Sequence, residues 1–196
     1  EFKPQFCFNL HDQRTIFNVE NTKNTATISF LAPSEEETRA LTKGRQETMS
    51  VIVAMNTMLQ EAIPNHVGRY TDEFYPTATG DNFQKLGFNT ILIESGHYPK
   101  DYIREVSRKY TFFAILQGLF YIAKTTDFTT YKPYFTIPNN AKAFCDVIHR
   151  YPNPKNDVGY QFKDEIINDK LISKLTKIDK STLKSKFGHH EIVFES

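Results

Sequence analysis

Two short apolar runs, each followed by a residue that can carry out chemistry, constrain the fold of this chain most strongly. The first run, residues 6–10, leads into His11, and the second, residues 90–93, leads into Glu94. Short apolar runs of this kind are typical of buried strands. The active sites of α/β sheets lie just beyond the carboxyl ends of such strands, so the two side chains are expected to share a cleft. The second run is continuously apolar, which predicts a central strand covered on both faces.

The sequence between and after these runs predicts two long helices. Ser34 and Glu37 have the spacing of a capping box, so the first helix is expected to begin there and to continue to about Ala62. Its buried stripe is predicted from helical spacing to contain Thr48, Ile52, Met55, Leu59 and Ile63. The second helix is expected from residues 99–101 to about residue 123. Its predicted buried stripe contains Ile103, Val106, Tyr110, Phe113 and Leu116.

The character of the sequence changes after residue 124. Residues 144–151, 158–162 and 171–178 have a β-like pattern, and Asn168-Asp169 is a suitable hairpin turn between the last two. We therefore expect an α/β domain over residues 1–125 and a small β-rich appendage over residues 126–196. The fold class is α/β, with a partial mixed β-sheet flanked by helices.

Composition narrows the possible partners and locations. The net charge of +1 gives no argument for nucleic acid or for a membrane surface, and no apolar run approaches the roughly 18 residues of a spanning helix. Cys7 and Cys145 lie in apolar contexts and are expected to be free thiols, which slightly favours a cytoplasmic location. The sequence lacks an initiator Met, so we expect it to be a piece of a longer polypeptide.

His11 and Glu94 are the strongest candidates for catalysis. A histidine at the end of a buried strand is costly without a partner, and a metal ion is one such partner. Burial of Glu94 would raise its pKa toward the value that a general base needs near neutral pH. The alternatives are a structural histidine with ordinary hydrogen bonds and a glutamate paired with a surface lysine. His97 is a further candidate for the same cleft. No phosphate-binding loop, His-x-x-Glu or His-Glu-x-x-His motif occurs.

A series of segments resembles the second half of the zinc metallocarboxypeptidase family, in particular a bacterial branch with a β-rich tail. The segments are Phe8-Asn9-Leu10-His11-Asp12-Gln13-Arg14, Ser29-Phe30-Leu31-Ala32-Pro33, Gly80-Asp81-Asn82-Phe83 and Thr90-Ile91-Leu92-Ile93-Glu94-Ser95-Gly96. The resemblance covers about residues 5–124, and the tail is similar to the extension of that branch. It implies the second half of a carboxypeptidase-like α/β fold.

The resemblance also implies roles for individual residues. His11 matches the third zinc ligand of the family, and Glu94 matches the glutamate that deprotonates the zinc-bound water. Asp12, Tyr75 and Asn82 match substrate-binding positions. The implied cofactor is zinc, and the implied reaction is hydrolysis of a C-terminal peptide bond.

The sequence departs from the family in one decisive respect. The family's first two zinc ligands, a His-x-x-Glu pair, are missing, as are the arginines and the asparagine that bind the substrate carboxylate. A catalytic zinc site needs three protein ligands. We therefore expect this chain alone to be inactive and to bind zinc only unstably. It is also expected to self-associate or to pair with a missing N-terminal half.

Two alternative functional hypotheses remain open. One is a zinc-dependent deacylase of small N-acyl amino acids, similar to succinylglutamate desuccinylase or aspartoacylase, whose superfamily also has a Leu-His strand end and a β tail. The other is a non-catalytic binding module that keeps the cleft as a recognition surface. Dependence of activity on peptide length would separate the peptidase from the deacylase.

Overall fold

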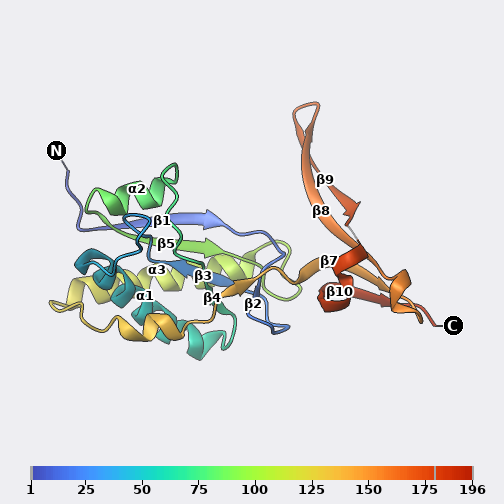
Figure 1. The fold of residues 1–196 in the computed structure, drawn as a ribbon, viewed down its shortest axis with the longest axis horizontal. Coiled ribbons are helices and arrows are strands. Elements are labelled where there is room, and N and C mark those ends of the chain that lie inside the picture. Colours follow the sequence, from blue (N-terminus) through green and yellow to red (C-terminus); the bar gives the residue numbers. More distant parts are fainter. Residues whose placement is uncertain (1, 179, 196) are drawn as a thin grey trace.

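The computed structural model describes residues 2–178 and 180–195, and only the backbone of residues 180–182. The α/β part contains the strands and helices β1 (Phe6–Asp12), β2 (Asn18–Val19), β3 (Ile28–Leu31), α1 (Lys43–Ala62), β4 (Val67–Arg69), α2 (Thr79–Lys85), β5 (Asn89–Ser95), α3 (Glu105–Lys124) and the 3-10 helix η1 (Lys132–Thr136). The rest contains β6 (Asn140–Ala141), β7 (Phe144–Arg150), η2 (Pro154–Asn156), β8 (Val158–Ile167), β9 (Lys170–Lys177), η3 (Lys180–Ser185) and β10 (Phe187–Val193). Strands β2 and β6 pair with each other in a two-stranded sheet. Figure 1 shows the two four-stranded sheets at opposite ends of an elongated molecule.

The first sheet is mixed, with the strand order β1-β5-β3-β4. Strand β5 runs parallel to β1 and antiparallel to β3, so the second apolar run is a central strand, as predicted. Strand β1 lies at the edge and is only partly buried, with Leu10 54% exposed. The expectation of a buried first strand was therefore wrong, because β1 has a hydrogen-bonded neighbour on one side only.

Helices cover both faces of this sheet. Successive side chains of a strand point to opposite faces. Phe8 packs beside Gly118 of α3, whereas its neighbour Asn9 lies beside Gly80 of α2. Met55 of α1 also lies against Gly118, so α1 and α3 share one face and α2 covers the other (Figure 1).

Helix α1 has the predicted buried stripe but a different start. Thr48, Ile52, Met55, Leu59 and Ile63 are all buried, as expected. The helix begins at residue 43, where Thr42 accepts a hydrogen bond from the Arg45 amide at 3.3 Å. The predicted capping box at Ser34 does not form, because Ser34 is buried and its hydroxyl donates to the Asp72 carbonyl at 2.6 Å. This tertiary hydrogen bond replaces the local one.

Helix α3 also differs from its prediction. It begins at residue 105, and the Asp101 carboxylate accepts hydrogen bonds from the first three helical amides, at 2.9–3.1 Å. Its fully buried residues are small: Ser107, Ala114 and Gly118. Larger side chains of the helix pack against the core and are partly buried, namely Tyr110, Ile115, Tyr121 and Ile122. Ile103, Phe113 and Leu116 of the predicted stripe are 76%, 39% and 51% exposed. The predicted stripe was right for Tyr110 and wrong for these three residues. The helix is apolar on several sides, so spacing alone does not define its packing face.

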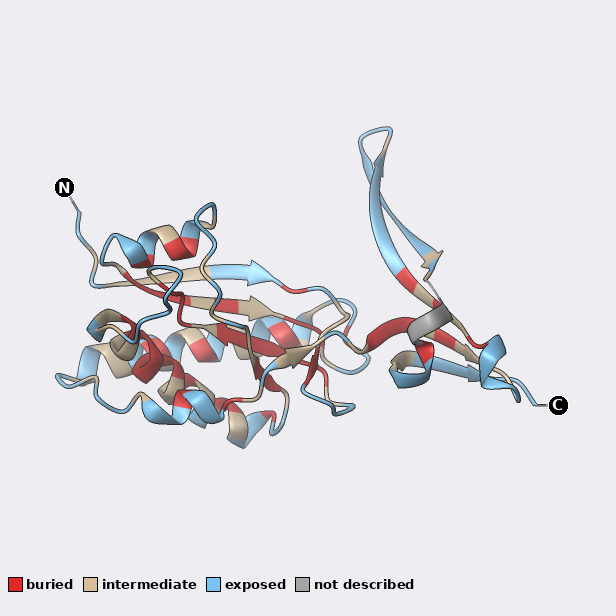
Figure 2. Cartoon of the chain, viewed as in Figure 1, coloured by how far each residue is buried: buried red, intermediate tan, exposed pale blue. Residues whose placement is uncertain are grey.

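The second sheet has the order β10-β7-β8-β9, and its hairpin strands β8 and β9 project away from the first sheet (Figure 1). Asn168 and Asp169 have φ angles of 49° and 58° and form the predicted turn. Most side chains of β8 and β9 are exposed (Figure 2). Tyr134 and Ile137, which precede this sheet, pack in the core of the first one. Within residues 2–178 and 180–195, no helix has the length and apolarity required to cross a membrane.

Candidate functional site

The parallel pairing of β1 and β5 brings the two predicted catalytic residues together. His11 lies directly opposite Glu94 in the register, so the prediction that the two strands are neighbours is confirmed. His11 Nδ1 lies 3.4 Å from Glu94 Oε1, and His11 Nε2 lies 3.1 Å from Asn9 Oδ1. When Nε2 donates to Asn9, Nδ1 is the ring nitrogen left to bind a proton or a metal ion.

Glu94 has the electrostatic surroundings of a proton acceptor. Its side chain is 14% exposed, whereas the His11 side chain is 47% exposed. Burial raises the pKa of Glu94 above its ordinary value, His11 opposes this rise and Asp12 adds to it. A carboxylate with a raised pKa binds a proton more readily near neutral pH, which is the property that a general base requires.

Arg104 joins the ends of the two strands that carry this pair. Its guanidinium donates to the carbonyl of Ser95 at 3.0 Å and to the carbonyl of Gln13 at 2.9 Å. It also lies 3.1 Å from the Asp12 carboxylate. Because Ser95 follows Glu94 and Asp12 follows His11, Arg104 holds the register that places the pair.

Two further side chains, Gln13 and Tyr70, lie near the pair, and no motif or periodicity in the sequence predicts this position. Gln13 is buried, donates to the Ala26 carbonyl at 2.8 Å and accepts a hydrogen bond from the Tyr70 hydroxyl at 2.8 Å. Burial and the charge of Glu94 raise the pKa of Tyr70, so its hydroxyl stays protonated and remains a donor. Tyr70 comes from the segment after β4, and only the tertiary structure brings it to this site.

Of the three predicted substrate-binding residues, only Asp12 is adjacent in sequence to a member of the His11–Glu94 pair. Asp12 directly follows His11 at the end of β1, with its side chain 82% exposed. Tyr75 is exposed, and its amide donates to Asp81 at 2.7 Å. The Asn82 side chain donates to the carbonyls of residues 76 and 78, at 2.8 and 2.9 Å. Among the described residues, neither Tyr75 nor Asn82 is bonded to the pair. Tyr75 is bonded within the loop that leads into α2, and Asn82 is bonded from α2 back to that loop.

His97 lies at the junction of the two parts of the chain, between Tyr102 and His189. It is 1% exposed, and its ring packs against those of Tyr102 and His189 at centroid distances of 4.8 and 4.3 Å. Burial first, and then electrostatic interactions with His189, Arg104 and His190, lower the pKa of His97 to about 3. Both ring nitrogens lack a hydrogen-bond partner in the described part of the chain. His97 is therefore a neutral packing residue of the junction and not a member of the pair's cleft.

The described residues do not assemble a complete zinc site. No group of three or more His, Cys, Asp or Glu side chains among them has a geometry that could hold a metal ion. His11 alone therefore does not fit zinc, which needs three protein ligands in a catalytic site. Comparisons of this chain with protein-family models, with curated proteins and with solved structures found no match.

Proposed function

We propose that this chain supplies the catalytic glutamate and one zinc-ligating histidine of a metallocarboxypeptidase-like hydrolase that cleaves C-terminal peptide bonds. The observation that supports this proposal is the β1–β5 register, which puts His11 opposite Glu94 with 3.4 Å between Nδ1 and Oε1. The resemblance of the segments around these residues to that family supports it further.

In the proposed reaction, Glu94 accepts a proton from the water molecule that attacks the carbonyl carbon of the C-terminal peptide bond. It then gives this proton to the nitrogen of the leaving amino acid as the carbon–nitrogen bond breaks. The raised pKa of Glu94 suits both steps, because the carboxylate must take up a proton and release it again. Arg104 acts as a positioning residue through its hydrogen bonds to the strand ends.

No reaction step is assigned to zinc, because the described residues hold no group of three His, Cys, Asp or Glu side chains that could bind it. The other ligands would have to come from outside the described residues. We therefore expect the isolated chain to be inactive and to carry no stoichiometric zinc. Stoichiometric zinc together with peptide turnover by residues 1–196 alone would contradict this part of the proposal.

The test uses the longest natural polypeptide that contains these residues. Zinc content is measured by mass spectrometry, and hydrolysis is measured with peptides that have a free or an amidated C-terminus. Glu94→Gln should retain zinc and lower kcat by about 10²–10⁴-fold, the usual range for loss of a general base. His11→Ala should lose both zinc and activity.

Glu37→Gln is the matched control, because Glu37 is an exposed carboxylate in the segment before α1. Its zinc content and kcat should equal those of the unmodified protein. Hydrolysis that survives Glu94→Gln would refute the assignment of the base. Binding of peptides without any hydrolysis would favour the non-catalytic module.

A further inference from the structure

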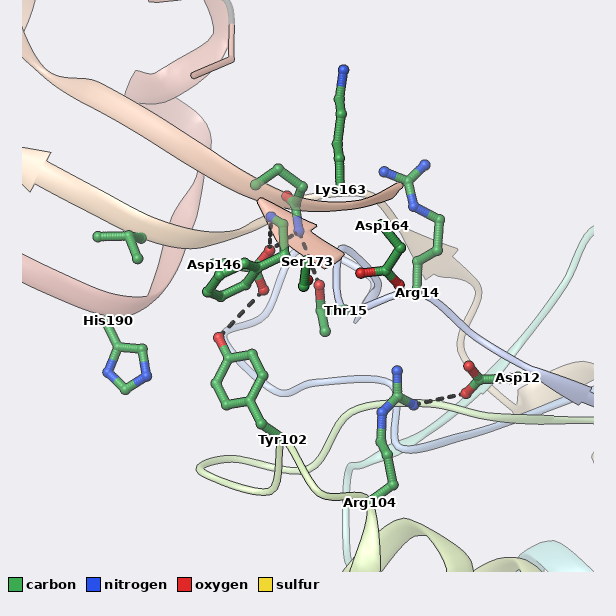
Figure 3. A pocket seen from close by; sticks show the side chains of 13 residues that line it. Asp12, Arg14, Thr15, Tyr102, Arg104, Asp146, Lys163, Asp164, Ser173 and His190 are labelled. Carbon is green, nitrogen blue, oxygen red and sulfur yellow. Dashed lines mark hydrogen bonds and ion pairs between the residues drawn. The ribbon is translucent and has the colours of Figure 1, made fainter. Parts of the chain in front are cut away.

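A cavity of about 1010 Å³ begins one residue beyond His11, between the first sheet and the second. Its lining includes Asp12 at the end of β1, Arg14 and Thr15 after it, and Tyr102 and Arg104 before α3. Side chains of the strands β7, β8, β9 and β10 complete the lining (Figure 3). Its volume is at the upper end of the range for small-molecule sites. It is therefore larger than a single N-acyl amino acid needs.

The floor of the cavity is rigid because its polar groups bond to one another. Asp146 is fully buried and accepts hydrogen bonds from the amide of Phe162 at 2.7 Å and from the Tyr102 hydroxyl at 3.3 Å. The Gln161 side chain donates to Asp146 as well, and also to the hydroxyl of Thr15 at 2.9 Å. These bonds join the second sheet to the segments after β1 and before α3 (Figure 3), so a ligand would meet a preformed surface.

The walls combine apolar and polar groups. Phe162 and Tyr102 are 42% and 38% exposed, and their rings meet edge to face with centroids 6.1 Å apart. In the described part of the chain, the Arg14 and Asp164 side chains have neither an ion pair nor a hydrogen bond. Ser173 lies opposite Asp164 in the register of β8 and β9. The cavity thus offers an apolar contact surface, hydrogen-bond donors and hydrogen-bond acceptors.

The charges of the lining balance, with three aspartates against two arginines and one lysine. A polyanion such as nucleic acid would require an excess of cations. A polypeptide, by contrast, presents alternating carbonyl acceptors and amide donors together with side chains, which matches this mixture.

We infer that this cavity binds the segment of a peptide that precedes its C-terminal residue, with an apolar side chain against Phe162 and Tyr102. The inference rests on the proposed function in one respect, since it takes the His11–Glu94 pair as the place where the peptide is cut. It assigns the second sheet to substrate binding and makes a peptide, and not a small N-acyl amino acid, the substrate class.

The test measures binding to residues 1–196 in the presence of EDTA, so that neither zinc nor turnover is needed. The probe is a fluorescein-labelled hexapeptide of alternating alanine and phenylalanine with a free C-terminus, followed by fluorescence anisotropy. Unlabelled hexapeptide and N-acetylphenylalanine are the competitors. The hexapeptide should compete at a concentration at least about tenfold lower, because only it reaches the cavity.

Phe162→Ala should weaken binding of the hexapeptide by about tenfold, the usual effect of truncating an aromatic anchor. Ser173→Trp, on the exposed strand β9, should block the cavity without removing any of its bonds. Phe135→Ala is the matched control, because Phe135 is 49% exposed on η1 and does not line the cavity. Thermal melting followed by circular dichroism verifies that each variant is folded.

Binding that depends on peptide length and is weakened in both cavity variants supports the inference, even if the hydrolysis assay fails. Equal competition by N-acetylphenylalanine, absence of binding, or full binding by folded Ser173→Trp overturns it, even if that hydrolysis assay succeeds. The two proposals can therefore fail separately.

Discussion

Replacement of Arg104 by asparagine tests whether the ends of β1 and β5 are held together by one side chain. The guanidinium donates to the carbonyls of Ser95 and Gln13, at 3.0 and 2.9 Å, and the Arg104 side chain is 24% exposed. Arg104 has a φ of 64°, a left-handed conformation that asparagine tolerates better than most residues. The substitution therefore removes the hydrogen bonds without adding backbone strain.

The expected loss follows from the two bonds to backbone carbonyls. Hydrogen bonds to charged groups contribute about 1.5–3 kcal/mol each, and partial exposure of Arg104 favours the lower end. The ion pair with Asp12 adds little, because that carboxylate is 82% exposed. Relief of strain at the left-handed position offsets part of the loss, at most about 1 kcal/mol. Arg104→Asn should thus lower the free energy of unfolding by about 2 kcal/mol.

The measurement is urea unfolding followed by far-ultraviolet circular dichroism. With a urea dependence of about 2 kcal/mol per molar, the midpoint should fall by about 1 M. Arg108→Asn on the exposed side of α3 and Asp12→Asn should shift the midpoint by less than about 0.3 M. A shift for Asp12→Asn as large as that for Arg104→Asn would refute the reasoning, since the ion pair and not the carbonyl bonds would then join the strands.

Two further predictions concern the junction and the core. Burial lowers the pKa of His97 from 6.5 in the unfolded chain to about 3 in the folded chain, so the unfolded chain binds a proton there at a higher pH. The free energy of unfolding should therefore decrease as the pH is lowered from 6.5, by up to about 1.4 kcal/mol per pH unit. Between pH 7 and 5, the urea midpoint should depend less on pH in His97→Phe than in His149→Phe. Equal pH dependence of the midpoint in the two variants would contradict the assignment to His97. Gly118→Ala should destabilise the chain by about 1–3 kcal/mol, because the added methyl group would lie 2.9 Å from Met55 Sδ and 3.2 Å from the Phe8 ring. An unchanged melting temperature for Gly118→Ala would show that α3 can move away from the sheet.

Much of the fold and the central pair could be predicted from local patterns. The run at residues 90–93 is the central strand β5, and the helical spacing in α1 gave its buried stripe correctly. The turn at Asn168-Asp169 also formed as predicted. In each case, neighbouring residues carry the information, because strand, helix and turn periodicities are local properties. The prediction that His11 and Glu94 lie together depended on one further rule, the position of active sites at strand ends. The zinc, the peptidase reaction and the family resemblance stay predictions.

Other features depended on contacts between distant segments, and only the tertiary structure decided them. Ser34 has the local signature of a helix cap, but its hydroxyl bonds to the Asp72 carbonyl, 38 residues away. The buried face of α3 is set by the small side chains that let the helix approach the sheet. Arg104 bonds to the carbonyl of Gln13, 91 residues earlier in the chain. The cavity forms only where the second sheet lies beside the end of β1. The sequence by itself thus determined which segments become strands and where the reactive residues stand on them. Packing determined what surrounds those residues, because a contact between distant segments leaves no periodic signal in either one.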